Sequence, residues 1–427
     1  MKRNLRRTLS LILAIVMISS ALGGCAAKET GAAPASGTAP AATTAPAAST
    51  TPVTGTTAAP AEKQEVLIGV MTSLSGTRAR SGELYKNGVL TALKHIEEDG
   101  FLKNYKIKFD FYDDLGTTEG APVAANLAIN NGVKACLGHF LTPMVMISGQ
   151  YFEEAKIPLI GSVSGPIVVQ QGWEFYHNGT VTDTDAADAL GEYLVKGKGL
   201  KRVFVMALND EGGIVGAKAV MDKMQQLGAT LVGYELFGQD DTDFTAQILK
   251  AKEGNADCII AYQTSSAANG YTIYQQIESL IGDVPTKVVL VGSTAFAGSS
   301  MLEAWPHENL AGILFPTGYI ADMSDPMKKR FADDFIALDR LHIAPSETPA
   351  RMYDAVWNIC QALNDMGPYD VNAPDFSVKL NDALSKVKRV GLQGQWDYGA
   401  FTDGRGLAVG NVGMWHADGT MEKVYPK

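Results

Sequence analysis

Residues 66–100 read VLIGVMTSLSGTRARSGELYKNGVLTALKHIEEDG, and this stretch decides the fold. It opens with an apolar run at 66–70 and passes through a loop of Ser, Thr and Gly that carries Arg78 and Arg80. Apolar positions spaced three and four apart then predict an amphipathic helix over 84–96 that ends at Gly100. A strand, a polar loop and a helix in this order indicate the first unit of an α/β fold.

The same alternation continues along the chain in two series. Most of the predicted strands are short and almost wholly apolar, as expected of strands that helices cover on both faces. We predict strands at residues 66–70, 106–112, 133–137 and 157–160, then at 202–208, 230–236, 258–262 and 288–291, and second-series helices at 215–227 and 244–252, the latter capped by Asp241 and Thr242. The sequence therefore predicts two consecutive α/β lobes, each with a doubly wound, mainly parallel sheet.

Polar loops follow the predicted strands. They comprise residues 72–76, 113–118, 138–142, 161–165, 209–213, 263–266 and 292–294. In an open parallel sheet such loops gather at the carboxyl edge, where these folds bind ligands. Their hydroxyls, backbone N–H groups and helix N-termini suit carboxylates and other small polar groups. The loops therefore predict a binding site for a small solute.

These loops lack the sequence patterns of catalysis. Residues 161–165 read GSVSG, with Val163 where a nucleophile elbow needs serine, and we expect no nucleophile beside a base. The six histidines never fall at the spacing of a zinc helix, and the sequence has no glycine-rich phosphate loop or dinucleotide fingerprint. We expect no cofactor, no metal and no catalytic function. An enzyme on the same fold is the less favoured alternative.

The N-terminal segment predicts export and anchoring. Residues 1–24 combine a basic start with an apolar stretch at 9–22, which is shorter than the roughly 20 residues that a spanning helix needs. The following Leu-Gly-Gly-Cys resembles the lipobox of bacterial lipoproteins, which implies lipidation of Cys25 and an extracytoplasmic protein tethered to the cell membrane. The alternative is an ordinary secretory signal with an incidental cysteine. Residues 25–63, rich in Ala, Thr and Pro, predict a disordered tether.

Composition narrows the class of protein further. The net charge of −10 argues against nucleic-acid binding. Residues 64–427 are long enough for two domains. Cys136, Cys258 and Cys360 have no close spacing, so we expect buried free thiols and no disulfide framework.

Several motifs together resemble the extracellular solute-binding proteins of branched-chain amino-acid ABC transporters, the leucine/isoleucine/valine-binding family. The resemblance runs from about residue 64 to the end of the chain. It rests on Ile68-Gly69-Val70 with Leu74-Ser75-Gly76 and Asn87-Gly88, Asp113-Asp114, Gly138-His139, Ile157-Pro158-Leu159-Ile160, Asp241-Thr242-Asp243-Phe244, Tyr353-Asp354-Ala355 and Trp415-His416-Ala417-Asp418-Gly419-Thr420.

The resemblance implies a two-lobed type I periplasmic-binding fold with three hinge crossings, which we place near residues 182, 318 and 405. The N-terminal lobe would comprise 64–181 and 319–404, and the C-terminal lobe 182–318 and 405–427. The ligand would lie in the cleft, and lobe closure would present the protein, expected as a monomer, to the permease subunits of an ABC importer. A sensory receptor that signals to a membrane partner is the alternative on the same fold.

The resemblance also implies where the ligand's carboxylate binds. The family's hydroxyl residue corresponds to Thr142, with Phe140 and Leu141 as walls. The next loop would add Ser162 and Ser164, and the alignment leaves open which of the two serines occupies the family's threonine position.

The other half of the implied site departs from the family. Thr294 stands where an acidic residue commonly pairs the ligand's ammonium, and Ser81, Gly212 and Thr264 or Ser265 replace aromatics. Asn209 and Glu211 are further candidates, and Glu211 could restore the ammonium partner. Phe140, Tyr262, Tyr271 and Phe296 could refill the enlarged pocket.

The two arginines of the first loop add positive charge at the cleft mouth. Arg78 and Arg80 would favour a ligand that is net negative or lacks an ammonium, if they reach inward. Alternatively they face water or pair with Glu83 or another acid.

Overall fold

The computed structural model describes residues 62–262, 267–298, 300–407 and 410–426, without the side chains of residues 211, 267 and 268. The predicted signal, Cys25 and the predicted tether lie outside these residues. Among the described residues, no helix combines the length and the apolar character needed to cross a membrane.

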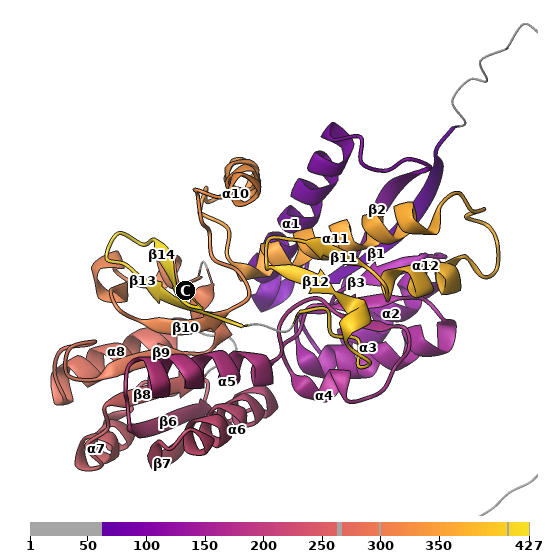
Figure 1. Ribbon diagram of the computed structural model, residues 1–427. Coiled ribbons are helices and arrows are strands. Elements are labelled where there is room, and N and C mark those ends of the chain that lie inside the picture. The colour runs from indigo at the N-terminus through magenta and orange to yellow at the C-terminus, as the bar shows by residue number, and fades with distance from the viewer. Residues whose placement is uncertain (1–61, 263–266, 299, 408–409, 427) are drawn as a thin grey trace, which may run out of the picture. The chain divides into compact units, whose positions relative to one another are not determined.

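The first lobe is built on a five-stranded parallel sheet (Figure 1). Its strand order is β2-β1-β3-β4-β5, and Val66 pairs with Ile107 in the register of β1 and β2. The strands are β1 (Gln64–Thr72), β2 (Tyr105–Asp113), β3 (Ala135–Leu137), β4 (Leu159–Gly161) and β5 (Tyr176–Asn178). The order reverses at β1, so the loops after β1 and β3 meet at the switch point where such sheets bind ligands.

Alternate side chains of β1 enter two separate cores. Ile68 and Val70 pack in one cluster and Met71 in the other, as the two-residue period of a strand requires. The first core lies under α1 (Ala79–Glu98), α10 (Pro326–Leu338), α11 (Glu347–Met366) and α12 (Phe376–Leu384). The second lies under α2 (Gly120–Asn130), α3 (Thr142–Ala155) and α4 (Pro166–Val169).

The second lobe has a seven-stranded sheet in the order β14-β13-β10-β9-β8-β6-β7. Its strands are β6 (Arg202–Leu208), β7 (Thr230–Phe237), β8 (Cys258–Tyr262), β9 (Val289–Gly292), β10 (Leu314–Thr317), β13 (Asn411–Trp415) and β14 (Met421–Tyr425). Strands β13 and β14 are antiparallel to their neighbours, and the remaining pairs are parallel.

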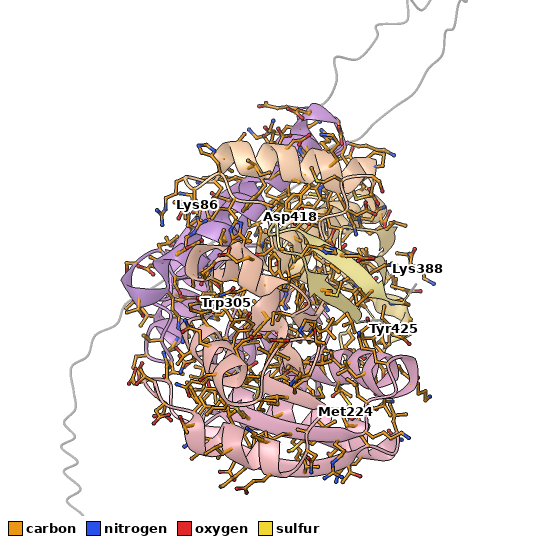
Figure 2. All side chains as sticks on the ribbon, turned by 90° about the vertical axis from the view of Figure 1, so that its left-hand side faces the viewer. Lys86, Met224, Trp305, Lys388, Asp418 and Tyr425 are labelled. Atoms are coloured by element: carbon orange, nitrogen blue, oxygen red, sulfur yellow. The ribbon has the colours of Figure 1, made fainter. Side chains whose placement is uncertain are left out.

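Helices cover both faces of this second sheet as well. One core includes Val203 and Met224, which is labelled in Figure 2, under α5 (Asp183–Gly191) and α6 (Glu211–Gln226). The other includes Phe204 under α7 (Thr245–Glu253), α8 (Ala267–Leu280) and α9 (Ser300–Ala304). In that core Trp305, also labelled in Figure 2, packs against the rings of Tyr271 and Tyr274.

The chain passes between the lobes three times. Helix α5 follows β5 of the first lobe but packs on α6, β10 and β13 of the second. Helix α11 follows β10 and packs on α1, and β13 then returns to pair with β10. A hairpin of β11 (Lys388–Val390) and β12 (Gln395–Asp397) precedes this return. The remaining short elements are η1 (Gly76–Arg78), η2 (Glu192–Gly197), η3 (Thr294–Ala297), η4 (His307–Leu310) and η5 (Tyr398–Ala400).

Most predicted elements are present within one to a few residues. Strands β6 and β8 have the predicted bounds, and the three cysteines are buried free thiols as expected. The predicted cap of α7 is wrong: the helix follows Phe244, and the Asp241 carboxylate accepts the Gly238 N–H at 2.7 Å instead. The patterns did not predict the short strands β5 and β10, the hairpin β11–β12 or the pair β13–β14.

A prediction concerns the contact between α1 and α11. A Cβ at Gly88 would lie 2.3 Å from the Pro349 carbonyl oxygen, so the Gly88→Ala substitution forces the two backbones apart. We expect a loss of unfolding free energy of about 1–3 kcal/mol, as for other overpacked cores. Chemical denaturation measures it. Gly399→Ala, where the nearest atom is at 3.5 Å, is the control and should change stability by less than about 0.5 kcal/mol; equal effects of both variants would contradict the packing argument.

Candidate functional site

A cavity of about 390 Å³ is lined by residues of both lobes. The loops after β1, β3, β4, β6 and β9 contribute to it, as the sequence predicted for a shared carboxyl edge. The predicted loop at 113–118 does not line it, and the loop after β8 lies outside the described residues beyond Tyr262. The first-lobe residues include Arg78, Arg80, Ser81, Tyr85, Phe140, Leu141, Thr142, Ser164, Ser346, Glu347, Thr348 and Arg351, and the second-lobe residues include Asp183, Asp210, Gly212, Tyr262, Ser293, Thr294 and Glu303.

Thr142 and Ser164 lie together on one wall of the cavity. Thr142 is the first residue of α3, so its hydroxyl stands at the helix start beside its own backbone N–H, which has no acceptor within the helix. Gly165 approaches it closely, since a Cβ there would lie 2.4 Å from Thr142 Oγ1. The Ser164 carbonyl accepts the Asp183 N–H at 2.7 Å, which joins this wall to the start of α5. This wall can hold an anionic group such as a carboxylate.

Ser162 does not line the cavity. Its carbonyl oxygen accepts hydrogen bonds from Tyr85 Oη at 3.2 Å and from Arg351 Nη1 at 3.3 Å. Its own hydroxyl is buried without a partner among the described residues. Of the two serines that the sequence left open, the structure therefore brings Ser164 to the cavity and leaves Ser162 behind the wall.

Arg80 lines the cavity but is held by acids. Its guanidinium donates to both oxygens of the fully buried Asp339 carboxylate, at 2.5 and 3.0 Å, and to Glu83 at 3.0 Å. It also reaches Glu303 of the second lobe at 3.4 Å. Burial alone would lower the pKa of Arg80, but these carboxylates raise it above its usual value. Of the two interpretations that the sequence allowed, Arg80 therefore follows the second: it pairs with Glu83 and another acid and does not reach inward to a ligand.

Arg78 also lines the cavity. Within the described part of the chain its guanidinium has no ion-pair or hydrogen-bond partner. Its aliphatic stem packs on Gly116, where a Cβ would lie 2.8 Å from Arg78 Cδ. Arg78 is thus the arginine of the pair that has charge to offer a ligand.

Asp183 is a cavity residue that the sequence analysis missed. It is the first residue of α5, only 6% exposed, and its Oδ1 accepts the Tyr262 hydroxyl at 2.8 Å. Burial raises the pKa of Asp183, which hydrogen bonds from Tyr262 and Ser164 and the charge of Arg351 partly offset. Sequence reasoning sought an acid only at Thr294 and Glu211. The signal was present in Thr182, whose capping box with Asp185 starts α5 and thereby orients Asp183.

A second missed feature is the pair of Glu347 and Arg351. Arg351 donates to Glu347 Oε1 at 2.5 Å from Nη2 and at 2.9 Å from Nε. The same carboxylate accepts the hydroxyls of Thr180 at 3.0 Å and Thr317 at 2.8 Å. Burial opposes the charge of Arg351, but Glu347 and neighbouring groups raise its pKa above the ordinary value. This pair therefore places two compensating buried charges close to two of the places where the chain changes lobe.

The remaining predicted residues divide into three groups. Ser81, Thr294, Phe140 and Leu141 line the cavity, and the Phe140 ring packs on Tyr85 with centroids 5.3 Å apart. Asn209 is exposed and does not line it. Thr264 and the Glu211 side chain lie outside what the structure describes.

Only two of the four aromatics expected to refill the pocket line it. Phe140 and Tyr262 do so, whereas Tyr271 and Phe296 pack around Trp305 in the second-lobe core. Small residues at positions 81 and 212 therefore leave space in the cavity.

A serine does stand beside a histidine, but in helix α3 and not in the polar loops for which the sequence predicted no nucleophile beside a base. His139 Nδ1 lies 2.7 Å from Asp114 Oδ2, and His139 Nε2 lies 2.9 Å from Ser148 Oγ. All three side chains have zero exposure, and the Ser148 hydroxyl also bonds the Ala121 carbonyl at 3.3 Å. A substrate cannot reach this chain of hydrogen bonds, so we interpret it as support for the loop that carries Thr142.

The contrast between the two arginines yields a prediction. Arg80→Met leaves the buried Asp339 carboxylate without its cation, and breaking such a pair costs about 3 kcal/mol of unfolding free energy. Arg78→Met removes an unpaired surface charge and should change stability by less than about 0.5 kcal/mol. Urea denaturation of both variants checks this, and a similar loss in each would contradict the assignment.

Comparisons with known proteins agree with this geometry. A family model described as "Periplasmic binding protein" matches residues 65–421. The Leu/Ile/Val-binding protein homolog 3 of Brucella melitensis is 28% identical over 324 residues, 74% of this chain and 83% of that protein. The Leu/Ile/Val-binding protein of Escherichia coli K12 is 22% identical over 197 residues, 46% of this chain and 54% of that protein.

Solved structures share the fold. LivJ of Streptococcus pneumoniae in complex with isoleucine is 21% identical with a TM-score of 0.71, covering 85% of this chain and 100% of that one. A solute binding protein of Rhodopseudomonas palustris in complex with benzoate is 16% identical with a TM-score of 0.70, covering 84% and 95%.

The relatives confirm three expectations drawn from the sequence: the family resemblance, the two-lobed type I fold and the lack of a catalytic function. Each of these relatives and structural neighbours is named as a binding protein. Because the match covers most of the sequence, this chain belongs to the periplasmic binding protein family.

Proposed function

We propose that this chain is the solute-binding component of an ABC importer and that it holds a small carboxylate-bearing solute, of the amino-acid type, in the cavity between its lobes. The single observation that carries this proposal is the cavity itself, which both lobes line and which has a wall of hydroxyls at a helix start. Its volume of about 390 Å³ falls within the range of small-molecule sites, roughly 300–1,000 Å³. Isoleucine and benzoate, the ligands of two structural neighbours, both carry a carboxylate.

We assign the ligand's carboxylate to Thr142 and Ser164. The N-terminus of α3 carries partial positive charge, and the Thr142 hydroxyl can donate in the same direction. Arg351 lines the cavity beside this wall and donates to the Ser162 carbonyl, while Glu347 compensates its charge.

We assign the ligand's ammonium to Asp183. This carboxylate belongs to the same cluster as Ser164 and lines the cavity, so one ligand can meet both groups. A buried acid without a salt-bridge partner favours a cation from the ligand. Asp183 thus supports a solute that carries an amine, in place of the amine-free ligand that Thr294 suggested. The ligand class of the family, an amino acid, is therefore the one we propose.

Closure of the lobes on the ligand would use the crossings near residues 182, 318 and 405. We keep the predicted division into 64–181 with 319–404 and 182–318 with 405–427. The bonds from Thr180 and Thr317 to Glu347 support pivots at the first two crossings, because they fix neighbouring residues to one helix start. The closed form would be the one that the permease recognises.

We also propose that the protein is a lipoprotein on the outer face of a cell membrane. The support is the sequence of the first 63 residues: an export signal, the lipobox-like Leu-Gly-Gly-Cys with Cys25, and a long tether rich in Ala, Thr and Pro. The acyl chains would keep the protein near its permease, while the tether gives the binding lobes reach.

A ligand panel tests the assignment of the carboxylate. Amino acids with aliphatic, polar and aromatic side chains, and carboxylates without an amine, are compared by thermal shift, since a ligand stabilises the native state that binds it. Thr142→Val keeps the side-chain shape but removes the hydroxyl, and we expect every active ligand to lose about tenfold in affinity. Thr117→Val, outside the cavity, is the control. Full binding by Thr142→Val, or no shift with any compound, would refute the proposal.

The pH dependence of binding tests Asp183. Its pKa lies above the ordinary 3.8 because the group is buried, so it takes up a proton at a higher pH than other aspartates do. As the pH falls through that raised pKa, the carboxylate becomes neutral and affinity for an ammonium-bearing ligand falls. We expect Asp183→Asn to bind amino acids about 30-fold more weakly and to lack this pH dependence.

Isothermal titration calorimetry between about pH 4 and pH 7, where free amino acids keep both charges, measures the effect. An amine-free carboxylate serves as the control ligand and should show no such loss above about pH 5.5, where it stays ionised. If wild type and Asp183→Asn bind an amino acid equally at neutral pH, the ammonium lies elsewhere.

A further inference from the structure

The N-terminus of α11 also faces the cavity. It belongs to a different part of the chain from the proposed carboxylate wall of Thr142 and Ser164. Helix α11 is 20 residues long, and its N-cap residue Ser346 and its first residues Glu347 and Thr348 all line the cavity. Helix α1 brings Ser81, Leu84 and Tyr85 to the cavity as well. The two helices touch where Gly88 meets Pro349, so these residues form one corner of the cavity.

The start of α11 lacks the cap that its sequence would allow. Ser346 has the extended backbone of an N-cap residue, with φ −94° and ψ −172°, but its side chain makes no capping hydrogen bond. The next N–H groups, of Glu347 and Thr348, have no partner within the helix. Pro349 has no N–H at all. Two backbone donors at the cavity therefore lack an intrahelical acceptor.

The Ser346 hydroxyl is a second, independent sign that this corner can bind a polar group. Ser346 is only 2% exposed, and its Oγ has no hydrogen-bond partner among the described residues. Buried hydroxyls are nearly always paired, because an unpaired one has lost its water without compensation. A serine can turn among its staggered rotamers, so this hydroxyl can meet an acceptor placed in the corner.

The charges around the corner favour an acceptor over a donor. The Glu347 carboxylate is already occupied by Arg351, Thr180 and Thr317. Glu303 is paired with Arg80, whereas Arg78 keeps its charge for the cavity. The partial positive charge of a long helix adds to that of Arg78.

We propose that this corner is a second polar subsite, formed by Ser346 and the N–H groups of Glu347 and Thr348, that binds a carboxylate or carboxamide oxygen at the far end of the solute. The inference rests on the proposed function, since it adds a partner for the ligand's side chain to the site that holds its α-carboxylate. The preferred solute is then an amino acid whose side chain ends in an sp² oxygen. An amino acid with an aliphatic side chain would leave the Ser346 hydroxyl unpaired.

Matched ligands test the subsite by calorimetry on ligand-free protein. L-asparagine and L-aspartate are compared with L-leucine, and L-glutamine and L-glutamate with L-methionine, because each set has a similar size and differs at the tip. We expect at least one oxygen-tipped compound to bind about tenfold tighter than its apolar match, in line with one or two hydrogen bonds. The comparison of each acid with its amide then decides whether the oxygen-bearing group that the subsite prefers is charged.

Ser346→Ala should reduce that preference about fivefold and leave affinity for leucine and methionine unchanged. Because the hydroxyl caps nothing and is buried without a partner, its removal should leave the melting temperature of the ligand-free protein unchanged or raise it. Asp325→Ala is the matched control: Asp325 does cap α10, bonding the N–H of Met327 at 2.8 Å and of Lys328 at 3.2 Å. It should lower the melting temperature and leave the preference intact.

Three results would overturn the subsite. They are leucine or methionine binding as tightly as its oxygen-tipped matches, Ser346→Ala weakening both kinds of ligand equally, and a lowered melting temperature of ligand-free Ser346→Ala. Thr142→Val separates these failures from failure of the proposed function: if it still weakens all ligands, the carboxylate site stands and only the second subsite falls. If none of the six compounds binds, both proposals fail.

Discussion

The buried Glu347 carboxylate is the interaction on which the cavity depends. It receives Arg351 from its own helix and the hydroxyls of Thr180 and Thr317 from two segments that leave their lobes nearby. A buried carboxylate is tolerated only when its lone pairs are filled, so these partners cannot move independently of one another. Arg351 in turn holds the Ser162 carbonyl, and the wall with Ser164 is thereby set in place.

The charged side chains of the cavity differ in how fully ion-pair partners neutralise them. Arg80 is neutralised by Asp339 and Glu83, and its reach to Glu303 links the two lobes. Arg78 and Asp183 have no ion-pair partner among the described residues. A solute with both charges would complete this arrangement, because each unpaired group would then face its opposite. If the lobes close on the ligand as proposed, water leaves the cavity and the attraction between these charges and the ligand becomes stronger.

Local periodicity predicted most of the strands and the polar loops at their carboxyl ends, and the family resemblance pointed to Thr142 and Ser164 within those loops. Neither predicted the partner of Arg80, since Asp339 lies 259 residues away. The sequence did not predict Asp183 and Arg351 as site residues for a similar reason. Their place in the cavity follows from the crossings between the lobes and not from a local motif. The short strands β5 and β10 lack enough residues to show a period.

The pairing of β13 with β10 has a consequence for biogenesis. Thr317 on β10 lies opposite Asn411 on β13, 94 residues later, so β10 stays an edge strand of the second sheet until that segment is available. An open edge can pair with strands of other molecules, which makes an incomplete chain prone to aggregation. Strand β13 thus protects β10 only late in folding, and a chain that lacks β13 and β14 would expose β10 to pairing with strands of other molecules.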